Sequence, residues 1–121
     1  DLDALESYIF LMKMRFENSF TFTVNKISDS GQHTIIPLTL QLLIENVFKH
    51  NVATEEMPLD IKITIDNEYI TVENNIQPSN DVDKGGIGLK YLTKQYTLYS
   101  KNVVVEHTKE LFIVKIPYIQ P

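Results

Sequence analysis

Four side chains of complementary chemistry lie close together between residues 45 and 50. They are a carboxylate, a carboxamide, an ammonium and an imidazole in consecutive turns of an expected helix: Glu45, Asn46, Lys49 and His50. Carboxylate and amide oxygens are ligands that suit Mg²⁺, and a neighbouring lysine suits a phosphate. The set therefore fits a metal–nucleotide, and the alternative is an ordinary solvated helix face.

Three of the four glycines are clustered just before another expected helix, at Gly85, Gly86 and Gly88. Glycines let the backbone approach a ligand closely, and the free N–H groups of a helix N-terminus attract anions. The run lacks the Gly-Lys-Ser/Thr ending of a Walker loop. It also differs from a dinucleotide-binding fingerprint, which requires a strand directly before the glycines, because no expected strand leads straight into this run. It predicts either a phosphate site or a simple turn.

Asn74 is the third candidate for a functional side chain. It shares a face with Ile70 and Val72 of an expected strand, so the alternation directs it inward. A buried amide must find hydrogen-bond partners. Asn74 is therefore either a local cap where the strand ends or a group that reads the edge of a base, since a carboxamide both donates and accepts.

The elements that must position these residues follow from hydrophobic periodicity. We expect helices over residues 2–17, 37–51 and 85–99, and strands over residues 20–24, 34–36, 61–65, 69–73, 103–107 and 111–116. A turn is expected over residues 28–32 and a polar loop over residues 74–84. This order predicts an α+β sandwich, in which a mixed, mostly antiparallel sheet carries helices on one face.

The first expected helix has apolar residues at alternating three- and four-residue steps, at Leu2, Leu5, Ile9, Met12 and Phe16. This pattern is typical of a helix that packs on the core, and equally of one that continues a longer coiled segment upstream. Because the chain opens inside a helical pattern, we expect it to be a fragment of a longer protein.

The amino-acid composition excludes several classes of function. The chain has 121 residues, 43% of them hydrophobic and 22% charged, which suits one globular domain. It has no cysteine, which excludes a disulfide framework, a thiolate zinc site and a cysteine nucleophile. Its net charge of -5 argues against binding to a nucleic-acid backbone. We see no apolar run long enough to span a bilayer and no signal-peptide pattern.

The three features occur in the order found in the GHKL ATPase superfamily, which includes gyrase, MutL and the sensor histidine kinases. More closely, the chain resembles the ATP-binding domain of LytS/YehU-type sensor histidine kinases. Residues 36–50 resemble that family's N box, P-x-x-L-Q-x-L-[VI]-E-N-x-x-K-H, and residues 86–92 resemble its second glycine box. Residues 5–16 resemble the helix that joins the phosphoacceptor domain to the ATPase domain.

The resemblance implies a Bergerat-type two-layer fold that binds ATP and Mg²⁺. Asn46 would coordinate the Mg²⁺, and Glu45 would be the catalytic group near the γ-phosphate. The implied ATP-binding residues are Asn46, Lys49, His50, Asn74, Gly86, Ile87, Gly88 and Leu89. One departure is that Asn74 stands where the family usually has the Asp that accepts a hydrogen bond from the adenine amino group, and Ile76 stands where it has a Gly.

The resemblance also implies a division of the chain and a set of partners. Residues 1–18 would link to an upstream dimerisation and phosphoacceptor domain, and residues 19–121 would be the ATP-binding catalytic domain of a two-component sensor kinase. The γ-phosphate would pass to a histidine on the upstream domain and then to a response regulator. The parent would be a homodimer anchored in the bacterial inner membrane, with this domain in the cytoplasm and no nucleic-acid partner.

None of the histidines present, His33, His50 and His107, resembles the phosphoacceptor, so we expect no autophosphorylation by this chain alone. Two alternatives stay open. The chain could be a degenerate domain that serves for docking or dimerisation, as the departures at Asn74 and Ile76 would allow. It could also be another GHKL member, such as a serine kinase of the anti-sigma type, although such a domain would normally begin with a strand.

Overall fold

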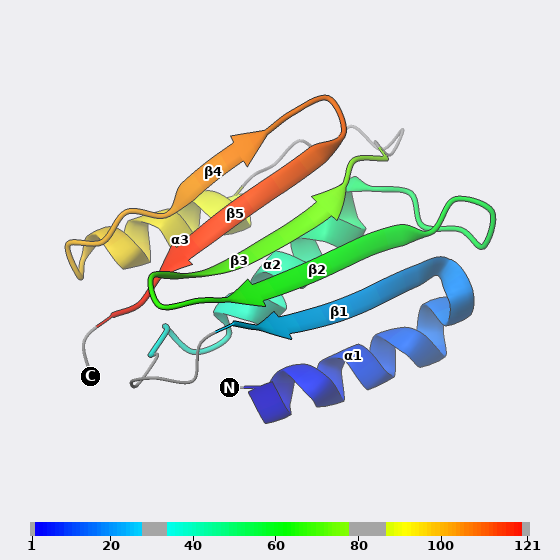
Figure 1. Cartoon of the computed structure of the whole chain (residues 1–121), viewed down its shortest axis with the longest axis horizontal. Helices are drawn as coiled ribbons and strands as arrows, with labels where there is room; N and C mark the ends of the chain where they lie inside the picture. The colour runs from blue at the N-terminus through cyan, green and yellow to red at the C-terminus, as the bar shows by residue number, and fades with distance from the viewer. Residues whose placement is uncertain (1, 28–33, 78–86, 120–121) are drawn as a thin grey trace.

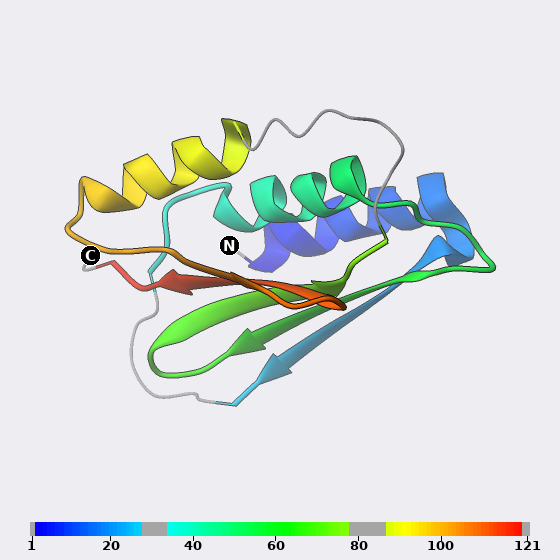
Figure 2. The same ribbon diagram turned by 90° about the horizontal axis from the view of Figure 1, so that it is seen from above.

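The computed structural model describes residues 2–27, 34–77 and 87–119. Over these residues, a single five-stranded sheet carries three α-helices on one face (Figures 1 and 2). The elements in chain order are α1 (Leu2–Phe16), a short 3-10 helix (Glu17–Ser19), β1 (Phe20–Lys26), α2 (Thr39–His50), β2 (Leu59–Ile65), β3 (Tyr69–Asn75), α3 (Ile87–Thr97), β4 (Val104–His107) and β5 (Leu111–Pro117). The predicted fold class is confirmed.

The strands lie in the order β1-β2-β3-β5-β4. Only β1 and β2 run parallel, and the chain between them crosses over through α2, as a parallel pair requires. The other neighbours are antiparallel, with β2–β3 and β4–β5 as hairpins. Asn74 of β3 lies between Ile61 on one neighbouring strand and Phe112 on the other.

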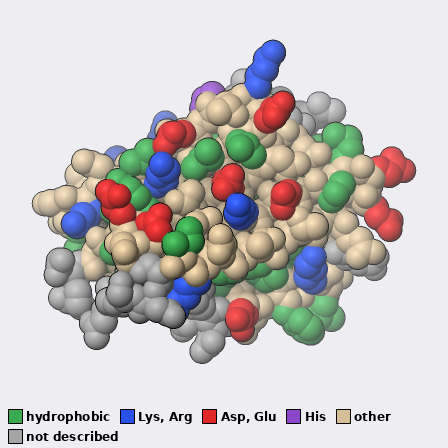
Figure 3. Space-filling model, viewed as in Figure 1, with side chains coloured by type: hydrophobic (Ala, Val, Ile, Leu, Met, Phe, Trp, Pro, Cys, Tyr) green, Lys and Arg blue, Asp and Glu red, His purple; other side chains and the backbone are tan. Residues whose placement is uncertain are grey.

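The core lies between the sheet and the helices. The inward side chains of β2 are buried, which are Leu59, Ile61, Ile63 and Ile65. Four apolar residues of α2 are buried against the sheet, which are Leu40, Leu43, Ile44 and Val47. No helix of the described residues covers the opposite face of the sheet, which shows interspersed acidic and basic side chains (Figure 3). Alternation in the strands thus gives one core face and one solvated face.

The helix α1 packs at the edge of the core. Leu5 is 1% exposed and Ile9 is 9% exposed. The Phe16 ring stacks on Phe48 of α2, with ring centroids 4.8 Å apart. The reading of α1 as a helix that packs on the core is therefore confirmed.

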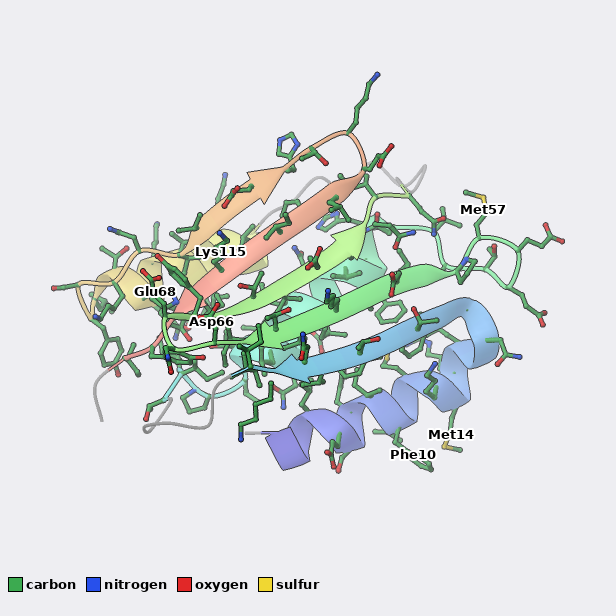
Figure 4. All side chains as sticks on the ribbon, in the orientation of Figure 1. Phe10, Met14, Met57, Asp66, Glu68 and Lys115 are labelled. Carbon is green, nitrogen blue, oxygen red and sulfur yellow. The ribbon has the colours of Figure 1, made fainter. Side chains whose placement is uncertain are left out.

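The outer face of α1 is also apolar in part. Phe10, Leu11 and Met14 are exposed there, and Phe10 and Met14 point away from the body of the molecule (Figure 4). Whether α1 continues upstream as a coiled segment stays a prediction.

Several expected boundaries were wrong. Residues 34–36 form only an isolated bridge, between Thr34 and Ile119, instead of a strand. The helix α2 begins at Thr39 and not at residue 37, because Leu38 has a left-handed backbone conformation with φ of 70°. Asn74 and Asn75 belong to β3 instead of the following loop. The expected turn at residues 28–32 and the glycine start of the third helix lie outside the described residues.

The third helix also ends earlier than expected. It ends at Thr97, and Tyr99 beyond it is 53% exposed and does not continue the buried side. Leu92 and Tyr96, which were expected on the same side, are buried at 1% and 0% exposure.

A buried hydrogen-bond cycle joins the start of α2 to α3. The Ile36 N–H donates to the Tyr96 hydroxyl at 3.0 Å, and the Thr39 hydroxyl donates to the Ile36 carbonyl oxygen at 2.6 Å. The two hydroxyls lie 2.9 Å apart, which leaves the Tyr96 O–H to donate to Thr39 Oγ1. Since Leu38 provides no side-chain cap, this cycle satisfies polar groups at the beginning of α2.

Candidate functional site

A cavity of about 260 Å³ opens between α2 and the sheet strands β3, β4 and β5. Most of its wall is apolar, and the residues concerned are Leu43, Val47, Val72, Ile76, Phe112 and Val114. Ligand pockets generally combine such walls with a few polar groups. The volume and the lining suit a flat ring system.

Five polar side chains line the same cavity, which are Asn46, His50, Asn51, Asn74 and His107. Asn46 and His50 lie one turn apart on α2 and are half-buried. The structure therefore brings together three of the predicted ATP-binding residues, Asn46, His50 and Asn74.

Asn74 is the polar residue buried most deeply in this cavity, at 2% exposure. Its Nδ2 donates to the backbone carbonyl oxygen of Asn75 at 2.8 Å. No described residue donates a hydrogen bond to its Oδ1. A buried acceptor without a donor is uncommon in folded proteins, so this oxygen is available to accept a hydrogen bond from a ligand or from water. Asn74 thus makes a local hydrogen bond through Nδ2, as the first interpretation expects, and keeps an open acceptor at Oδ1, which the second interpretation requires.

Glu45 and Lys49 lie on the other flank of α2. They line a groove of about 400 Å³ between α1 and α2, together with Tyr8, Met12, Arg15, Phe16 and Phe48. At about 100° per residue, the pair 45 and 49 is centred about 100° around the helix from the pair 46 and 50. The four residues first considered together are therefore divided between two surfaces.

The groove between α1 and α2 has mixed charge. Burial raises the pKa of the Tyr8 phenol, the negative charge of Glu45 raises it further, and the positive charge of Arg15 lowers it. The charges of Glu45 and Arg15 therefore both act on Tyr8. Glu45 itself is exposed.

Gly88 and Leu89 lie at the start of α3, where they border a small crevice beside Asn46. A Cβ built on Gly88 would meet no described atom within 4 Å, so packing does not require a glycine there. Gly86 lies outside the described residues, and so does the side chain of Ile87.

Sequence reasoning missed three residues of the cavity, Asn51, His107 and Phe112. Asn51 follows α2 and holds the chain after β3, since its Oδ1 accepts from the Gln77 N–H at 2.8 Å. Its Nδ2 donates to the Val47 carbonyl oxygen at 2.9 Å. Strand alternation places Phe112 on the same face as Val114, which was the available signal for it.

The polar side chains of the cavity suit a magnesium ion whose ligands come mainly from a bound nucleotide. No group of three or more His, Cys, Asp or Glu residues that could hold a metal occurs among the described residues. Mg²⁺ usually takes one or two protein oxygens and completes its shell with phosphates and water. The half-buried carboxamide of Asn46 at the edge of the cavity can supply one such oxygen.

The chain is similar in sequence to a bacterial sensor kinase. The sensor protein kinase HptS of Staphylococcus aureus strain USA300 is 29% identical over 113 residues, which are 92% of this chain and 20% of that protein. The chain thus spans about a fifth of the length of this relative. No protein-family model matches the chain.

The chain is also similar in fold to solved structures of known proteins. The catalytic domain of histidine kinase ThkA gives a TM-score of 0.62 at 18% identity and covers 98% of this chain and 94% of that one. The chain has the fold of a histidine kinase catalytic domain. The cytoplasmic segment of histidine kinase QseC gives a TM-score of 0.61 at 13% identity, with 97% and 72% covered.

These findings confirm the resemblance to the GHKL ATP-binding domain of sensor histidine kinases. The narrower LytS/YehU type stays a prediction. None of the helices that the structure describes is long and apolar enough to cross a membrane.

Proposed function

We propose that this domain binds Mg-ATP in the cavity between α2 and β3, and supplies the γ-phosphate to a histidine on a separate domain of a two-component sensor kinase. The phosphate would then pass to a response regulator. The parent protein would be a homodimer anchored in the bacterial inner membrane, with this domain in the cytoplasm. As predicted, residues 1–18 would lead to the phosphoacceptor domain and residues 19–121 would form the nucleotide-binding unit.

The observation that carries the proposal is the open acceptor of Asn74 inside an apolar cavity. Its Oδ1 suits the exocyclic amine of adenine, and Val72, Ile76 and Phe112 provide walls for the ring. Asn46 and His50 lie on the same cavity's α2 side, where they suit the magnesium and the sugar or phosphates.

The phosphate end of the site would be completed by the start of α3. The backbone after Gly86, through Ile87, Gly88 and Leu89, would offer N–H groups to phosphate oxygens. When bound, Mg²⁺ would offset the charge of the β- and γ-phosphates. Phosphoryl transfer needs mainly positioning and charge stabilisation, which these groups would share.

Glu45 and Lys49 would act on the α1 side of α2. Because both line the groove beside α1, they would meet an acceptor that arrives along α1 and not the base. Glu45 would be the catalytic group that contacts the incoming histidine, and Lys49 would stabilise phosphate oxygens during transfer.

Calorimetric titration tests the nucleotide site. The chain is titrated with a non-hydrolysable ATP analogue, with and without Mg²⁺, alongside the variant Asn46→Ala. We expect Mg²⁺ to tighten binding in the natural chain, and Asn46→Ala to lose most of that gain, on the order of tenfold in Kd. Asn25→Ala, an exposed site on β1, is the control. Absent binding, or binding that Mg²⁺ and Asn46→Ala leave unchanged, would refute the proposal in favour of a non-catalytic docking domain.

The variant Glu45→Gln distinguishes an effect on phosphate transfer from an effect on nucleotide binding. Since Glu45 lies on the opposite flank of α2 from the cavity, we expect the Kd for the ATP analogue to change less than about twofold. Formation of acid-labile phosphohistidine in the full-length parent should fall at least about a hundredfold. A variant that transfers phosphate normally would exclude Glu45 as the catalytic group. An acid-stable phosphoamino acid in the parent would favour the serine kinase.

A further inference from the structure

The exposed face of α3 combines lysines with large apolar side chains. Leu92 and Tyr96 face the core, whereas Lys90, Tyr91 and Lys94 on the opposite side of the helix are exposed. At about 100° per residue, these three exposed positions fall within one arc of about 100°. We call this face, together with the turn that follows it, the α3 patch. Its residues are Lys90, Tyr91, Lys94, Leu98, Tyr99 and Lys101.

The turn after α3 holds the apolar end of the α3 patch in place. The Ser100 N–H donates to the Thr97 carbonyl oxygen at 2.9 Å, and the Lys101 N–H donates to the Tyr96 carbonyl oxygen at 3.0 Å. Ser100 has a left-handed backbone with φ of 60°, so these bonds form the Schellman motif that ends many helices. Leu98, which is 85% exposed, therefore projects from a hydrogen-bonded turn at one extremity of the molecule (Figures 1 and 2).

The charge of this region is opposite to that of the whole chain. Residues 84–105 contain four lysines and no aspartate or glutamate, although the net charge of the chain is -5. No carboxylate of the described residues forms an ion pair with Lys90, Lys94 or Lys101. The α3 patch is therefore a local positive surface that also presents exposed apolar groups.

We propose that the α3 patch docks on the surface of a lipid bilayer that carries anionic headgroups. The negative potential of such a surface attracts lysines, and exposed leucine and tyrosine side chains enter the boundary between headgroups and acyl chains. Leu98 would enter furthest, because it is the most exposed large apolar side chain of the described residues. This binding needs no nucleotide, so the inference goes beyond the proposed function.

The composition of the α3 patch favours a bilayer over an acidic protein. All its cations are lysines, which act as point charges on flexible stems. Arginine is the residue that pairs carboxylates through two hydrogen bonds and is enriched in protein interfaces, whereas lysine is depleted there. A lipid surface needs only positive charge close to it, and tyrosine is typical of the boundary between membrane and water.

The position of α3 in the fold allows this contact. The helix α2 lies between α1 and α3, so α3 is at one side of the helix layer (Figure 2). Gly88 and Leu89, which border the crevice beside Asn46, lie at the opposite end of α3 from Leu98. A bilayer on the α3 patch would therefore meet the end of the helix that is farther from this crevice.

Co-sedimentation with vesicles tests the docking surface. The chain is mixed, without nucleotide, with vesicles of phosphatidylcholine alone or of an equimolar mixture of phosphatidylcholine and phosphatidylglycerol. We expect the partition coefficient to be at least about tenfold higher for the mixed vesicles, and to fall as the salt concentration rises. Absent binding to the mixed vesicles, or equal binding to both kinds, would overturn the proposal.

The double variant Lys90→Gln/Lys94→Gln tests the charges. Since each lysine near an anionic surface contributes about fivefold, we expect the partition coefficient to fall by at least about tenfold. The matched control is Lys62→Gln/Lys109→Gln, which removes the same charge from exposed sites on β2 and on the β4–β5 hairpin. It should lower the coefficient by less than about twofold. Equal losses in the two double variants would show that no particular face docks.

The variant Leu98→Gln tests entry into the bilayer. We expect the partition coefficient to fall at least about fivefold, by a factor that salt leaves unchanged, because this contribution is apolar. Leu11→Gln makes the same change at an exposed site on α1 and should have an effect of less than about twofold. Normal vesicle binding by Leu98→Gln would refute the entry of this side chain and the docking geometry with it.

Polyglutamate serves as the probe for an acidic protein. Binding of the chain to polyglutamate, together with no binding to the mixed vesicles, would overturn the bilayer in favour of a protein partner. Because none of these measurements contains a nucleotide, their failure would leave the proposed ATP site standing.

Discussion

His107 lies at the end of β4, where it is exposed to solvent and lines the cavity together with His50 of α2. Nothing in the described structure assigns it a packing role, since its paired residue across the hairpin, Phe112, forms the wall itself. Substitution of an exposed side chain usually changes the free energy of unfolding little. At the scale of single residues, His107 therefore differs from Asn74, which lines the same cavity but is 2% exposed.

Substitution of His107 tests its contribution to nucleotide binding. We expect His107→Ala to weaken binding of the ATP analogue by about two- to tenfold, the loss of one hydrogen bond or ring contact. The melting temperature should change little because the side chain is exposed. Calorimetry and thermal unfolding measure the two effects. Lys109→Ala, at the turn of the same hairpin, is the control, and an equal loss in both variants would point to the hairpin and not to the imidazole.

At the scale of elements, the start of α2 depends on α3. The backbone at Leu38 is left-handed, with φ of 70°, and provides no side-chain cap. The cycle of Ile36, Thr39 and Tyr96 takes over that role from the neighbouring helix. The helix that carries Asn46 is thus fixed at its beginning by a residue far away in the sequence.

Tyr96→Phe tests this dependence. The change removes one hydroxyl and leaves the Ile36 N–H without its buried acceptor. We expect a loss of about 1–3 kcal/mol in the free energy of unfolding, measured by urea titration. Tyr99→Phe removes a hydroxyl from a side chain that is 53% exposed and should cost less than about 0.5 kcal/mol. Similar values for the two variants would show that the cycle does not stabilise α2.

Most elements could be predicted from the sequence because their periodicity reflects one buried face. The alternation in Ile61, Ile63 and Ile65 gave β2, and the spacing from Leu40 to Val47 gave α2. The start of α2 could not be predicted, because the left-handed Leu38 breaks the usual preference for glycine at positive φ. The expected strand at residues 34–36 failed because its backbone bonds go to Tyr96 and Ile119 instead of a neighbouring strand.

The candidate site could be predicted only in part. The inward position of Asn74 followed from strand alternation and is confirmed by its 2% exposure. The division of Glu45 from Asn46 was not foreseen, since a helical wheel shows the polar arc but not which neighbour faces each side. Here α1 lies against one flank and the sheet against the other. The position of His107 in the cavity could not be predicted, because it depends on the order of the strands in the sheet.

At the scale of the whole molecule, a tyrosine near the C-terminal end of the described chain ties together the turn between β2 and β3. The Tyr118 hydroxyl donates to the carbonyl oxygens of Asp66 and Tyr69, at 2.6 Å and 3.0 Å. Burial, and to a smaller extent the negative charge of Asp66, raises the pKa of Tyr118 to about 12. The folded protein therefore holds this phenol in its neutral form.

Alkaline unfolding tests this arrangement. The unfolded phenol has a pKa near 10, so the stability due to the neutral form is complete below about pH 10 and is lost as the pH rises toward about 12. We expect the natural chain to lose free energy of unfolding more steeply over this window than Tyr118→Phe does. Urea titrations at a series of pH values measure both slopes. Parallel slopes would mean that Tyr118 ionises equally in the folded and unfolded chains.

The order of the strands sets the order in which the site can form. The hairpins β2–β3 and β4–β5 pair residues close in the chain, whereas the β1–β2 and β3–β5 pairings join distant segments and close slowly. The cavity takes side chains from α2, β3 and the β4–β5 hairpin, so it exists only after the two hairpins have joined. A nucleotide would therefore bind only late in folding, after the cavity has formed. Bound nucleotide would then slow unfolding without accelerating folding.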